Sequence, residues 1–502
     1  MIEKEILSAV KYVSRMKPEF MLSEIKQYVK GDYTVGQLFD AINPHLYDLR
    51  LSCSAENGDY KIRRAPAPAP LKLNDEETKR HEAFLETSRV PRKLERLVES
   101  YIEKKTGKKW DNPAVIEKIR KAILDQKEQY WKEGAKRKIS YEKGYSILGY
   151  LAYQFPVYFV QFEHIFYELA LDGVLKDRMK ILDAGSGPGT VSLAIIDFYN
   201  RQNTGEAKVY AMEMYDENIE AYSSIVPEYA SVKSKISIEP PIKADISNLN
   251  MEAIPDNLDL IVFSNVLNEL RVKTIEQRAE IVTKIAEKLS GDGSIIIIEP
   301  ADKVNSIEMR NLTTELMNKG LGVYSPCSFI WCAKDKCRSK ECWSFEQKDD
   351  IQPTGLMKKT SETDEPFRYL NTDIKYTYAV LRKDTLTRNK YQVPPRAKFA
   401  RLSKMQIHVG KRINVVASKM SRDLGDRKNM IFKLCDGTSQ KQVYAVIPAH
   451  GVGPGNEALR NADYGDVIGI ENVLVRYNEE KDAYNLLIGA ASITYDIKEG
   501  PE

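Results

Sequence analysis

The sequence predicts an α/β protein built around a doubly wound parallel sheet, with helical regions before the sheet and a small β-barrel after it. Short apolar runs alternate with helical patterns between about residues 179 and 300. A glycine-rich turn follows the first of these runs, and five short β-rich runs lie beyond residue 412. With 502 residues, 42% apolar and 29% charged, the chain has room for three or four domains.

Residues 1–64 are predicted to form a winged-helix-like module. Apolar residues recur at helical spacing in 6–14, 22–29 and 35–49, and two short β-rich runs follow them. Asn57-Gly58 between those two runs is a strong hairpin signal. Modules of this kind bind nucleic acid or protein, and the sequence does not choose between the two.

The next segments are predicted to connect this module to the sheet. Residues 65–74 are a stiff Pro-rich linker, and residues 75–140 a charged helical region. Tyr145–Phe162 carries no charge, but a proline, glutamines and four tyrosines interrupt it at a length that barely crosses a bilayer. We therefore expect a buried helix pair there and no membrane partner. Because Glu3 and Glu5 do not fit a targeting peptide, we expect a cytoplasmic protein.

The most informative stretch is residues 181–190, Ile-Leu-Asp-Ala-Gly-Ser-Gly-Pro-Gly-Thr. A buried strand leads into it, and an apolar helical face follows it. Gly185, Gly187 and Gly189 permit tight backbone turns that a Cβ atom would block. Such a loop places backbone N–H groups against a ligand, and a turn that serves packing alone is the alternative.

Polar residues end the strands that follow the glycine turn. Glu213 lies 24 residues after Gly189, near the roughly 20-residue offset at which an acid meets a ribose in doubly wound folds. Asp245 follows the third strand, and Asn265 follows the fourth. A ligand site therefore belongs at the carboxyl ends of the strands. The second to fifth predicted strands are 208–212, 236–238, 258–263 and 293–298.

The Asp-x-Gly-x-Gly-x-Gly loop without a Walker lysine, followed by these acids, resembles class I S-adenosylmethionine-dependent methyltransferases. In that family the loop holds the amino-acid part of the cofactor, the acid matching Glu213 holds the ribose hydroxyls, and the one matching Asp245 contacts the adenine amine. Asn265 matches a position beside the methyl group. A nicotinamide cofactor is the alternative, which Asp183 and Pro188 fit less well. The implied cofactor-binding residues are Asp183, Gly185, Ser186, Gly187, Gly189, Glu213, Asp245 and Asn265.

Four of the six cysteines lie within sixteen residues at an unbroken C-x4-C-x4-C-x4-C spacing. Sparse cysteine usage elsewhere and the lack of a secretory signal argue against a disulfide framework and favour a metal site. Zinc ligands usually come in pairs two to four residues apart, whereas an evenly spaced loop suits an iron–sulfur cluster at least as well. Zinc and four unligated thiols are the alternatives. The predicted ligands are Cys327, Cys332, Cys337 and Cys342.

A methyltransferase-like domain with Glu-Pro after its fifth strand, a four-cysteine segment and a closing strand at 375–382 resembles a particular family. These are the methyltransferase-like assembly factors of the mitochondrial ribosomal small subunit and their prokaryotic relatives. Ser264–Leu270, Ser-Asn-Val-Leu-Asn-Glu-Leu, is similar to the fourth motif of that family. The resemblance implies a class I methyltransferase domain over residues 141–383 with a cysteine insertion at 323–346. The expected closing strands are Phe367–Leu370 and Tyr376–Leu381.

The same resemblance implies three ligands: S-adenosylmethionine at the glycine loop, a 4Fe-4S cluster on the four cysteines, and small-subunit ribosomal RNA as partner. It leaves the catalytic step open. Residues 264–270 hold neither the Asn/Asp-Pro-Pro-Tyr/Phe loop of exocyclic-amine methylation nor a nucleophilic cysteine. Oxygen or ring-nitrogen acceptors need less, because transfer from a sulfonium relies heavily on proximity and alignment.

The C-terminal region, residues 399–498, is predicted to be an OB-like domain that binds RNA. Residues 381–433 carry 15 Lys and Arg against three acids, an electrostatic footprint for phosphates that the whole-chain net charge of +3 hides. A solvated face or linker is the alternative. Phe432 and Tyr444 are either base-stacking or core side chains. The predicted strands are 413–418, 430–435, 443–447, 467–475 and 484–488.

Three functions remain open at this point. The first is a methyltransferase that acts on small-subunit ribosomal RNA, with the barrel and the N-terminal module holding RNA. The second is a noncatalytic ribosome assembly factor of the same fold. The third is a protein or small-molecule methyltransferase, against which the basic block argues, because phosphate contacts give salt-dependent RNA affinity.

Overall fold

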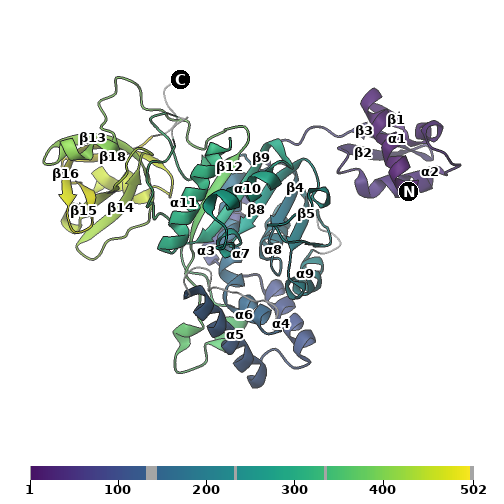
Figure 1. The fold of residues 1–502 in the computed structure, drawn as a ribbon, viewed down its shortest axis with the longest axis horizontal. Helices are drawn as coiled ribbons and strands as arrows, with labels where there is room; N and C mark the ends of the chain where they lie inside the picture. The colour runs from purple at the N-terminus through teal and green to yellow at the C-terminus, as the bar shows by residue number, and fades with distance from the viewer. Residues whose placement is uncertain (1, 132–143, 231–234, 333–335, 498–502) are drawn as a thin grey trace. The chain divides into compact units, whose positions relative to one another are not determined.

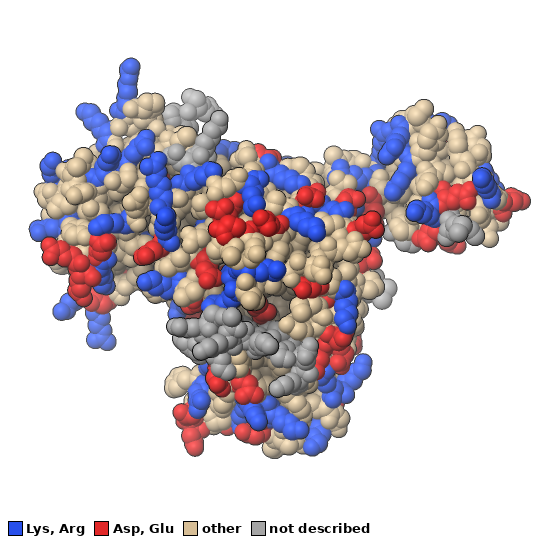
Figure 2. All heavy atoms as spheres, viewed as in Figure 1, with Lys and Arg blue, Asp and Glu red and all other residues tan. Residues whose placement is uncertain are grey.

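The computed structural model describes residues 2–131, 144–230, 235–332 and 336–497. The chain divides into two compact units, residues 1–69 and 70–502, whose helices and strands are drawn in Figure 1. Lys and Arg are interspersed with Asp and Glu over the face seen in Figure 2. The predicted boundary at residues 140–141 and the predicted end at residue 498 lie outside the described residues.

The N-terminal unit packs three helical segments against an antiparallel sheet of order β1-β3-β2. Asn57 and Gly58 turn the hairpin at φ 51° and 80°, as the Asn-Gly signal predicts. The segment predicted as a second α-helix is a 3₁₀-helix, and the third helix ends earlier than expected. The winged-helix-like interpretation stays a prediction. The elements are α1 (Ile2–Met16), β1 (Glu19–Met21), η1 (Leu22–Tyr28), α2 (Val35–Ile42), η2 (Asn43–His45), β2 (Leu51–Glu56) and β3 (Asp59–Arg64).

The second unit is built around a sheet of order β10-β12-β9-β8-β4-β5-β6. The strands from β6 to β9 in this order run parallel, and β12 and β10 are antiparallel. The winding direction reverses between β4 and β8, which is the topological switch point where doubly wound sheets bind ligands. The strands are β4 (Arg178–Ala184), β5 (Glu206–Glu213), β6 (Ile236–Ile238), β7 (Ile242–Lys243), β8 (Leu258–Ser264), β9 (Leu289–Pro300), β10 (Gly322–Ser325), β11 (Glu346–Gln347) and β12 (Lys375–Arg382).

Apolar side chains of the central strands alternate between the two faces of this sheet. On β8, Leu260 and Val262 join one buried cluster, and Ile261 and Phe263 join the other. Both faces are therefore covered, as the continuous apolar runs predict. Helices α7 (Phe155–Leu171), α8 (Thr190–Asn200) and α9 (Asp216–Tyr229) contribute to the first cluster, and α10 (Ile275–Ala286) and α11 (Lys303–Asn318) to the second.

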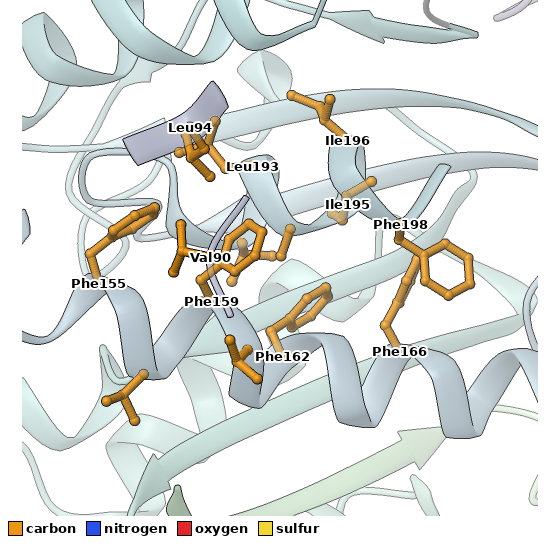
Figure 3. Close-up of a cluster of buried hydrophobic side chains, with 14 of the residues drawn as sticks. Val90, Leu94, Phe155, Phe159, Phe162, Phe166, Leu193, Ile195, Ile196 and Phe198 are labelled. Atoms are coloured by element: carbon orange, nitrogen blue, oxygen red, sulfur yellow. The ribbon is translucent and has the colours of Figure 1, made fainter. Parts of the chain in front are cut away.

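The uncharged stretch that begins at Tyr145 forms the predicted buried helix pair, α6 (Ser146–Tyr153) and α7. Figure 3 shows the phenylalanines of α7 directed at the apolar side chains of α8. Phe166 and Phe198 meet edge to face, with ring centroids 4.7 Å apart. In the parts of the chain that the structure describes, no helix has the length and apolar content to cross a membrane. The helices α3 (Asp75–Thr87), α4 (Arg92–Thr106), α5 (Pro113–Trp131) and α12 (Gly355–Thr360) complete this region.

The C-terminal region is the predicted five-stranded barrel. Pairing of β13 with β16 closes it, and β15 and β17 are parallel neighbours. Phe432 is 2% exposed in the barrel core, so of the two alternatives for this side chain the core position is confirmed. The five barrel strands and their flanking elements are β13 (Arg412–Lys419), β14 (Asn429–Cys435), β15 (Gln442–Pro448), α13 (Glu457–Asn461), β16 (Val467–Asn478), β17 (Ala483–Leu487) and β18 (Ile493–Asp496).

One predicted closing strand is also wrong. Residues 366–368 form a 3₁₀-helix that starts at Pro366, where proline lacks the N–H that a ladder needs. Phe367 in this turn is 84% exposed. The edge position belongs instead to β10, so the cysteine segment lies between β10 and β12.

Phe166→Ala is expected to lower the free energy of unfolding by about 3–5 kcal/mol, because it removes a fully buried ring between α7 and α8. The matched variant Phe367→Ala should change it by less than about 0.5 kcal/mol, since this ring is exposed. Chemical denaturation of both variants measures the difference. Equal losses would contradict the packing described here.

Candidate functional site

A pocket of about 250 Å³ opens at the carboxyl ends of β4, β5 and β8, beside the switch point of the sheet. Seven of the eight predicted cofactor-binding residues line it. Gly189 does not line the pocket and instead begins α8. The seven are Asp183, Gly185, Ser186, Gly187, Glu213, Asp245 and Asn265.

The glycine turn needs its glycines for conformation and for space. Gly185 and Gly189 have φ of 77° and 95°, in the left-handed region that favours glycine. A Cβ atom on Gly185 would lie 2.5 Å from Val266 Cγ2, and one on Gly189 would lie 2.4 Å from Val226 Cγ2. The turn is therefore pressed against the β8 loop on one side and α9 on the other.

Glu213 ties the end of β5 to this turn. Its Oε2 accepts the Gly187 N–H at 2.9 Å, and its Oε1 accepts the N–H groups of Met214 and Tyr215 at 2.9 Å. Burial raises the pKa of the carboxyl, and these backbone donors act in the opposite direction. An acid in this position orients the loop, and its oxygens line the pocket as hydrogen-bond acceptors.

Asp183 performs a different task from the other acids. Its Oδ2 accepts the Ser192 N–H at 3.1 Å and the Ser192 hydroxyl at 2.8 Å, so it fixes the first turns of α8. Burial raises the pKa of this carboxyl to about 7. The carboxylate thus holds the helix whose N-terminus faces the pocket.

Asp245 and Asn265 lie on the other walls of the pocket. Asp245 Oδ1 accepts the N–H and the hydroxyl of Ser247, each at 2.7 Å, which orders the loop after β7. Asn265 has φ 56°, and its buried Oδ1 has no hydrogen-bond partner among the described residues. The same holds for Ser186 Oγ. Buried polar atoms without partners around one pocket fit a ligand with polar groups of its own.

Two tyrosines that the sequence did not single out also line the pocket. Tyr150 comes from α6 and Tyr158 from α7, and their rings meet edge to face with centroids 6.3 Å apart. The Tyr150 hydroxyl lies 3.2 Å from Thr190 Oγ1, at the start of α8. The one sequence feature that could have pointed to them is the presence of four tyrosines in an uncharged stretch. Buried helices commonly carry tyrosines, so this feature alone does not indicate a pocket.

The four predicted metal ligands are not equivalent in the structure. Cys332 is exposed, whereas Cys342 is buried and Cys327 and Cys337 are half-buried. Cys435, at the end of β14 in the barrel, lies close enough to Cys327, Cys337 and Cys342 for them to act on its thiol. Burial raises the pKa of the Cys435 thiol well above its ordinary value, and Cys337, Cys342 and Cys327 raise it further. Within the described residues, no three His, Cys, Asp or Glu side chains are arranged closely enough to hold a metal ion.

Two buried cations lie beside these thiols. Arg310 of α11 is 3% exposed and donates to the Tyr378 carbonyl at 2.7 Å and to Tyr464 Oη at 3.0 Å. Its Nε has no hydrogen-bond partner among the described residues. Burial alone would lower the pKa of this guanidinium, but Tyr464 and the thiols of Cys327, Cys342 and Cys337 raise it.

The second cation is Lys433, which is 4% exposed on β14. Its Nζ lies 3.6 Å from Cys342 Sγ and 2.5 Å from the Trp343 carbonyl oxygen. Buried cations need negative charge nearby, and thiolates are the groups at hand that could supply it. These two cations favour the thiolate form that binds a metal, whereas burial raises the pKa of the Cys327, Cys337 and Cys435 thiols and favours the protonated form.

Comparisons with known proteins agree with this description only in outline. Residues 403–497 match the family described as "Domain of unknown function (DUF8157) C-terminal domain", and residues 3–57 match its N-terminal domain. No curated protein sequence matches the chain.

The solved structures similar to the chain include several methyltransferases. A putative S-adenosylmethionine-dependent methyltransferase of Methanococcus maripaludis has 19% identity and a TM-score of 0.25, and the match covers 36% of this chain and 74% of that one. Magnesium protoporphyrin IX methyltransferase of Synechocystis has 12% identity and a TM-score of 0.28, and the match covers 54% of this chain and 99% of that one. A putative RNA methyltransferase of Pyrococcus horikoshii has 12% identity and a TM-score of 0.26, and the match covers 52% of this chain and 94% of that one. At such scores, the strand order and the pocket carry the fold assignment.

Gly189→Ala is expected to destabilise the protein by about 1–3 kcal/mol, because alanine disfavours φ 95° and its Cβ would clash with α9. Gly291→Ala is the matched control, since a Cβ there meets no atom within 4 Å. Thermal unfolding of the two variants should separate them by several degrees, in the order stated. A Gly189→Ala protein as stable as the control would count against the described turn.

The free energy of unfolding of Asp183→Asn is expected to increase relative to that of the wild-type protein as the pH rises. The folded-state pKa of about 7 exceeds the value of about 3.9 in an unfolded chain, so the wild-type protein loses stability between these values. Asparagine still offers an acceptor to Ser192, and it removes the titration. Denaturation at about pH 4 and about pH 8 measures the effect. Asp216→Asn at an exposed site is the control, and parallel pH profiles for all three proteins would refute the expectation.

Proposed function

We propose that this chain binds S-adenosylmethionine and acts as a methyltransferase-like protein on small-subunit ribosomal RNA or in the assembly of that subunit. One observation carries the proposal. A glycine turn, the acid after the second strand and the acid after the third strand line one pocket at the switch point of a doubly wound sheet. This is the arrangement that the resemblance to class I methyltransferases implies.

Each wall of the pocket has an assigned task in this proposal. The N–H groups of the glycine turn and the N-terminus of α8 receive the carboxylate of the cofactor. Glu213 accepts the ribose hydroxyls, and Asp245 accepts the adenine amine. Tyr150 and Tyr158 cover the pocket from α6 and α7 and exclude water, and Asn265 lies beside the transferred methyl group. Bound S-adenosylmethionine supplies a sulfonium methyl group, and the protein supplies its alignment with an acceptor.

The proposal includes a metal centre with a revised ligand set, although among the described residues no three such side chains lie closely enough in the structure to hold a metal ion. Cys327, Cys337 and Cys342 would move together to bind it with Cys435 of the barrel, and the exposed Cys332 would not take part. Four thiolates around a 4Fe-4S cluster, or around zinc as the alternative, leave a negative site that Arg310 and Lys433 offset. The centre would stabilise the contact between the barrel and the sheet domain, because its ligands come from both.

RNA is the proposed partner because of the charge on the C-terminal region. Lys411 and Arg412 at the start of β13 and Arg427 and Lys428 before β14 are exposed. The closed five-stranded barrel supports the OB-like interpretation, a fold that binds oligonucleotides. Small-subunit ribosomal RNA as the particular partner rests on the family resemblance.

A noncatalytic assembly factor is the second candidate. The loop after β8 favours it, because the buried acid Glu299 beside this loop is bonded to the protein's own backbone. The Asn268 N–H donates to Glu299 Oε1 at 3.2 Å, and burial raises the pKa of Glu299 to about 8. Glu299 does not line the pocket, although Glu269 does. In this reading the cofactor stabilises a shape that binds the immature subunit.

Glu213→Gln is expected to weaken S-adenosylmethionine binding by about 10- to 100-fold, because it removes charge-assisted hydrogen bonds. Isothermal titration calorimetry with the cofactor measures this. Glu280→Gln on the exposed face of α10 is the control and should bind as the wild-type protein does. Asp245→Asn provides a second pocket variant in case Gln at 213 disturbs folding. Failure of the wild-type protein to bind the cofactor would refute the proposal.

Methyl transfer is tested with cofactor labelled on its methyl group and small ribosomal subunits from cells that lack this protein. Label in ribosomal RNA that depends on the wild-type pocket supports the enzyme. Cofactor-dependent binding to the subunit without label supports the assembly factor. Label in protein alone would favour the third function and contradict both ribosomal ones.

Cys435→Ser is expected to abolish metal binding, and Cys332→Ser is expected to leave it unchanged. Iron, acid-labile sulfide and zinc are measured in proteins purified without oxygen, together with the visible absorption spectrum. Cys53→Ser in the N-terminal unit is the control. The opposite order, with metal lost on substitution of Cys332, would restore the evenly spaced ligand set.

A further inference from the structure

The barrel face formed by β14 and β15 is covered by the cysteine segment of the same chain. In OB-like barrels the second and third strands form the usual oligonucleotide-binding face. Here the Gln442 side chain donates to the Glu341 carbonyl at 2.9 Å, and Lys433 donates to the Trp343 carbonyl at 2.5 Å. The usual face therefore lies against the protein, and RNA needs another surface.

The covering segment continues along the barrel beyond this face. Ser344 Oγ lies 3.1 Å from the Met420 carbonyl oxygen and 2.7 Å from Tyr464 Oη. Trp331 Nε1 donates to Asp436 Oδ2 at 2.8 Å. The segment is thus fixed on the barrel by several hydrogen bonds, and its outer side takes the place of the covered strands.

Trp343 is the feature of this outer side that suits a nucleobase. Its ring is 46% exposed, although its Nε1 donates to the Ala301 carbonyl at 2.9 Å and its backbone carbonyl accepts from Lys433. Phe345 lies beside it, with ring centroids 5.9 Å apart. Because an exposed indole fixed through its ring nitrogen and its backbone carbonyl is already ordered, it loses little conformational freedom when a base stacks on it.

Exposed cations precede Trp343 in the same segment. Lys336, Arg338 and Lys340 are all exposed and lie within seven residues of the tryptophan. Exposed Glu341 is the one acid between Lys336 and Trp343. A basic strip that leads to a fixed aromatic ring is the combination by which proteins bind single-stranded nucleic acid.

The anchor of Trp343 also places it toward the cofactor pocket. Ala301 directly follows β9, and the Ile298 carbonyl of that strand accepts the Asn265 N–H at 2.8 Å. Asn265 lines the pocket. A strand of RNA stacked on Trp343 would therefore lie beside the edge of the sheet where the methyl group is proposed to be.

We propose that Trp343, together with Lys336, Arg338 and Lys340, binds single-stranded RNA in place of the covered barrel face. This inference rests on the proposed function, since it names the surface that holds the RNA. The tryptophan stacks on a base, and the cations contact the phosphates on one side of it. The cysteine segment then has two roles, since its inner side holds the barrel and its outer side holds RNA.

The experiment measures binding of a fluorescein-labelled single-stranded RNA of about 15 nucleotides to the full chain. Trp343→Ala is expected to weaken binding by about 10- to 100-fold, and Trp343→Phe to recover much of that loss, because phenylalanine also stacks. The double variant Arg338→Gln/Lys340→Gln should lower the slope of log affinity against log salt by about 1.4. Tryptophan fluorescence quenched by RNA in the wild-type protein and less in Trp343→Phe reports the stacking directly.

Matched controls separate this surface from exposed cations and rings elsewhere. Lys108→Gln/Lys109→Gln removes two exposed cations after α4, and Phe367→Ala removes an exposed ring. Neither is expected to change RNA affinity by more than about twofold. Cofactor titration and thermal unfolding of each variant show that the pocket and the fold are intact.

The possible outcomes are distinguishable. Loss of RNA binding in Arg427→Gln/Lys428→Gln, with Trp343→Ala unchanged, overturns the inference and leaves the proposed function standing. A wild-type protein that binds S-adenosylmethionine but no RNA at low salt overturns both the inference and the RNA part of the proposed function. Equal loss in Trp343→Ala and Trp343→Phe with unquenched fluorescence also overturns the stacking role.

Discussion

The buried guanidinium of Arg310 is the interaction on which the arrangement of the second unit depends. It extends from α11 to the Tyr378 carbonyl of β12 and to Tyr464, next to the start of β16, and three cysteines lie around it. Removing an arginine from water costs several kcal/mol unless negative charge compensates. A guanidinium in this position therefore needs the Tyr378 carbonyl of β12 and the Tyr464 hydroxyl beside the barrel as its partners, so the sheet and the barrel meet around it.

This requirement explains why the barrel is used differently from an isolated one. Lys433 and Cys435 occupy outward-facing positions of β14, next to core residues Phe432 and Leu434 on the same strand. In an isolated barrel these outward positions would face solvent. Here they face the cysteine segment, so this side of the barrel is covered by the chain itself. The exposed cations Lys336, Arg338 and Lys340 lie on the covering segment.

Most of the sheet could be predicted from the sequence because its signals are local. Buried strands such as 258–263 are continuous apolar runs. The turn is recognised by its three glycines, which are needed because its backbone has positive φ values that other residues rarely adopt. The barrel was predictable for the same reason. Cys435 could not be grouped with the other cysteines, because it lies 93 residues beyond Cys342 and only the fold brings them together. The regular spacing of the four cysteines favoured Cys332 as a ligand, but spacing along the chain does not determine which thiols are buried.

The cysteine segment also connects the two ends of the proposed reaction path. Trp343 is fixed to Ala301 just after β9, and β9 in turn holds the Asn265 backbone at the pocket. Any change that loosens the segment, such as loss of a metal, would release Trp343 from one anchor and leave the glycine turn with its own anchors at Glu213 and Asp183. Cofactor binding and RNA binding would then respond differently to the same loss. The fold thus separates a pocket built on the sheet from the proposed RNA surface, which is built on the cysteine segment.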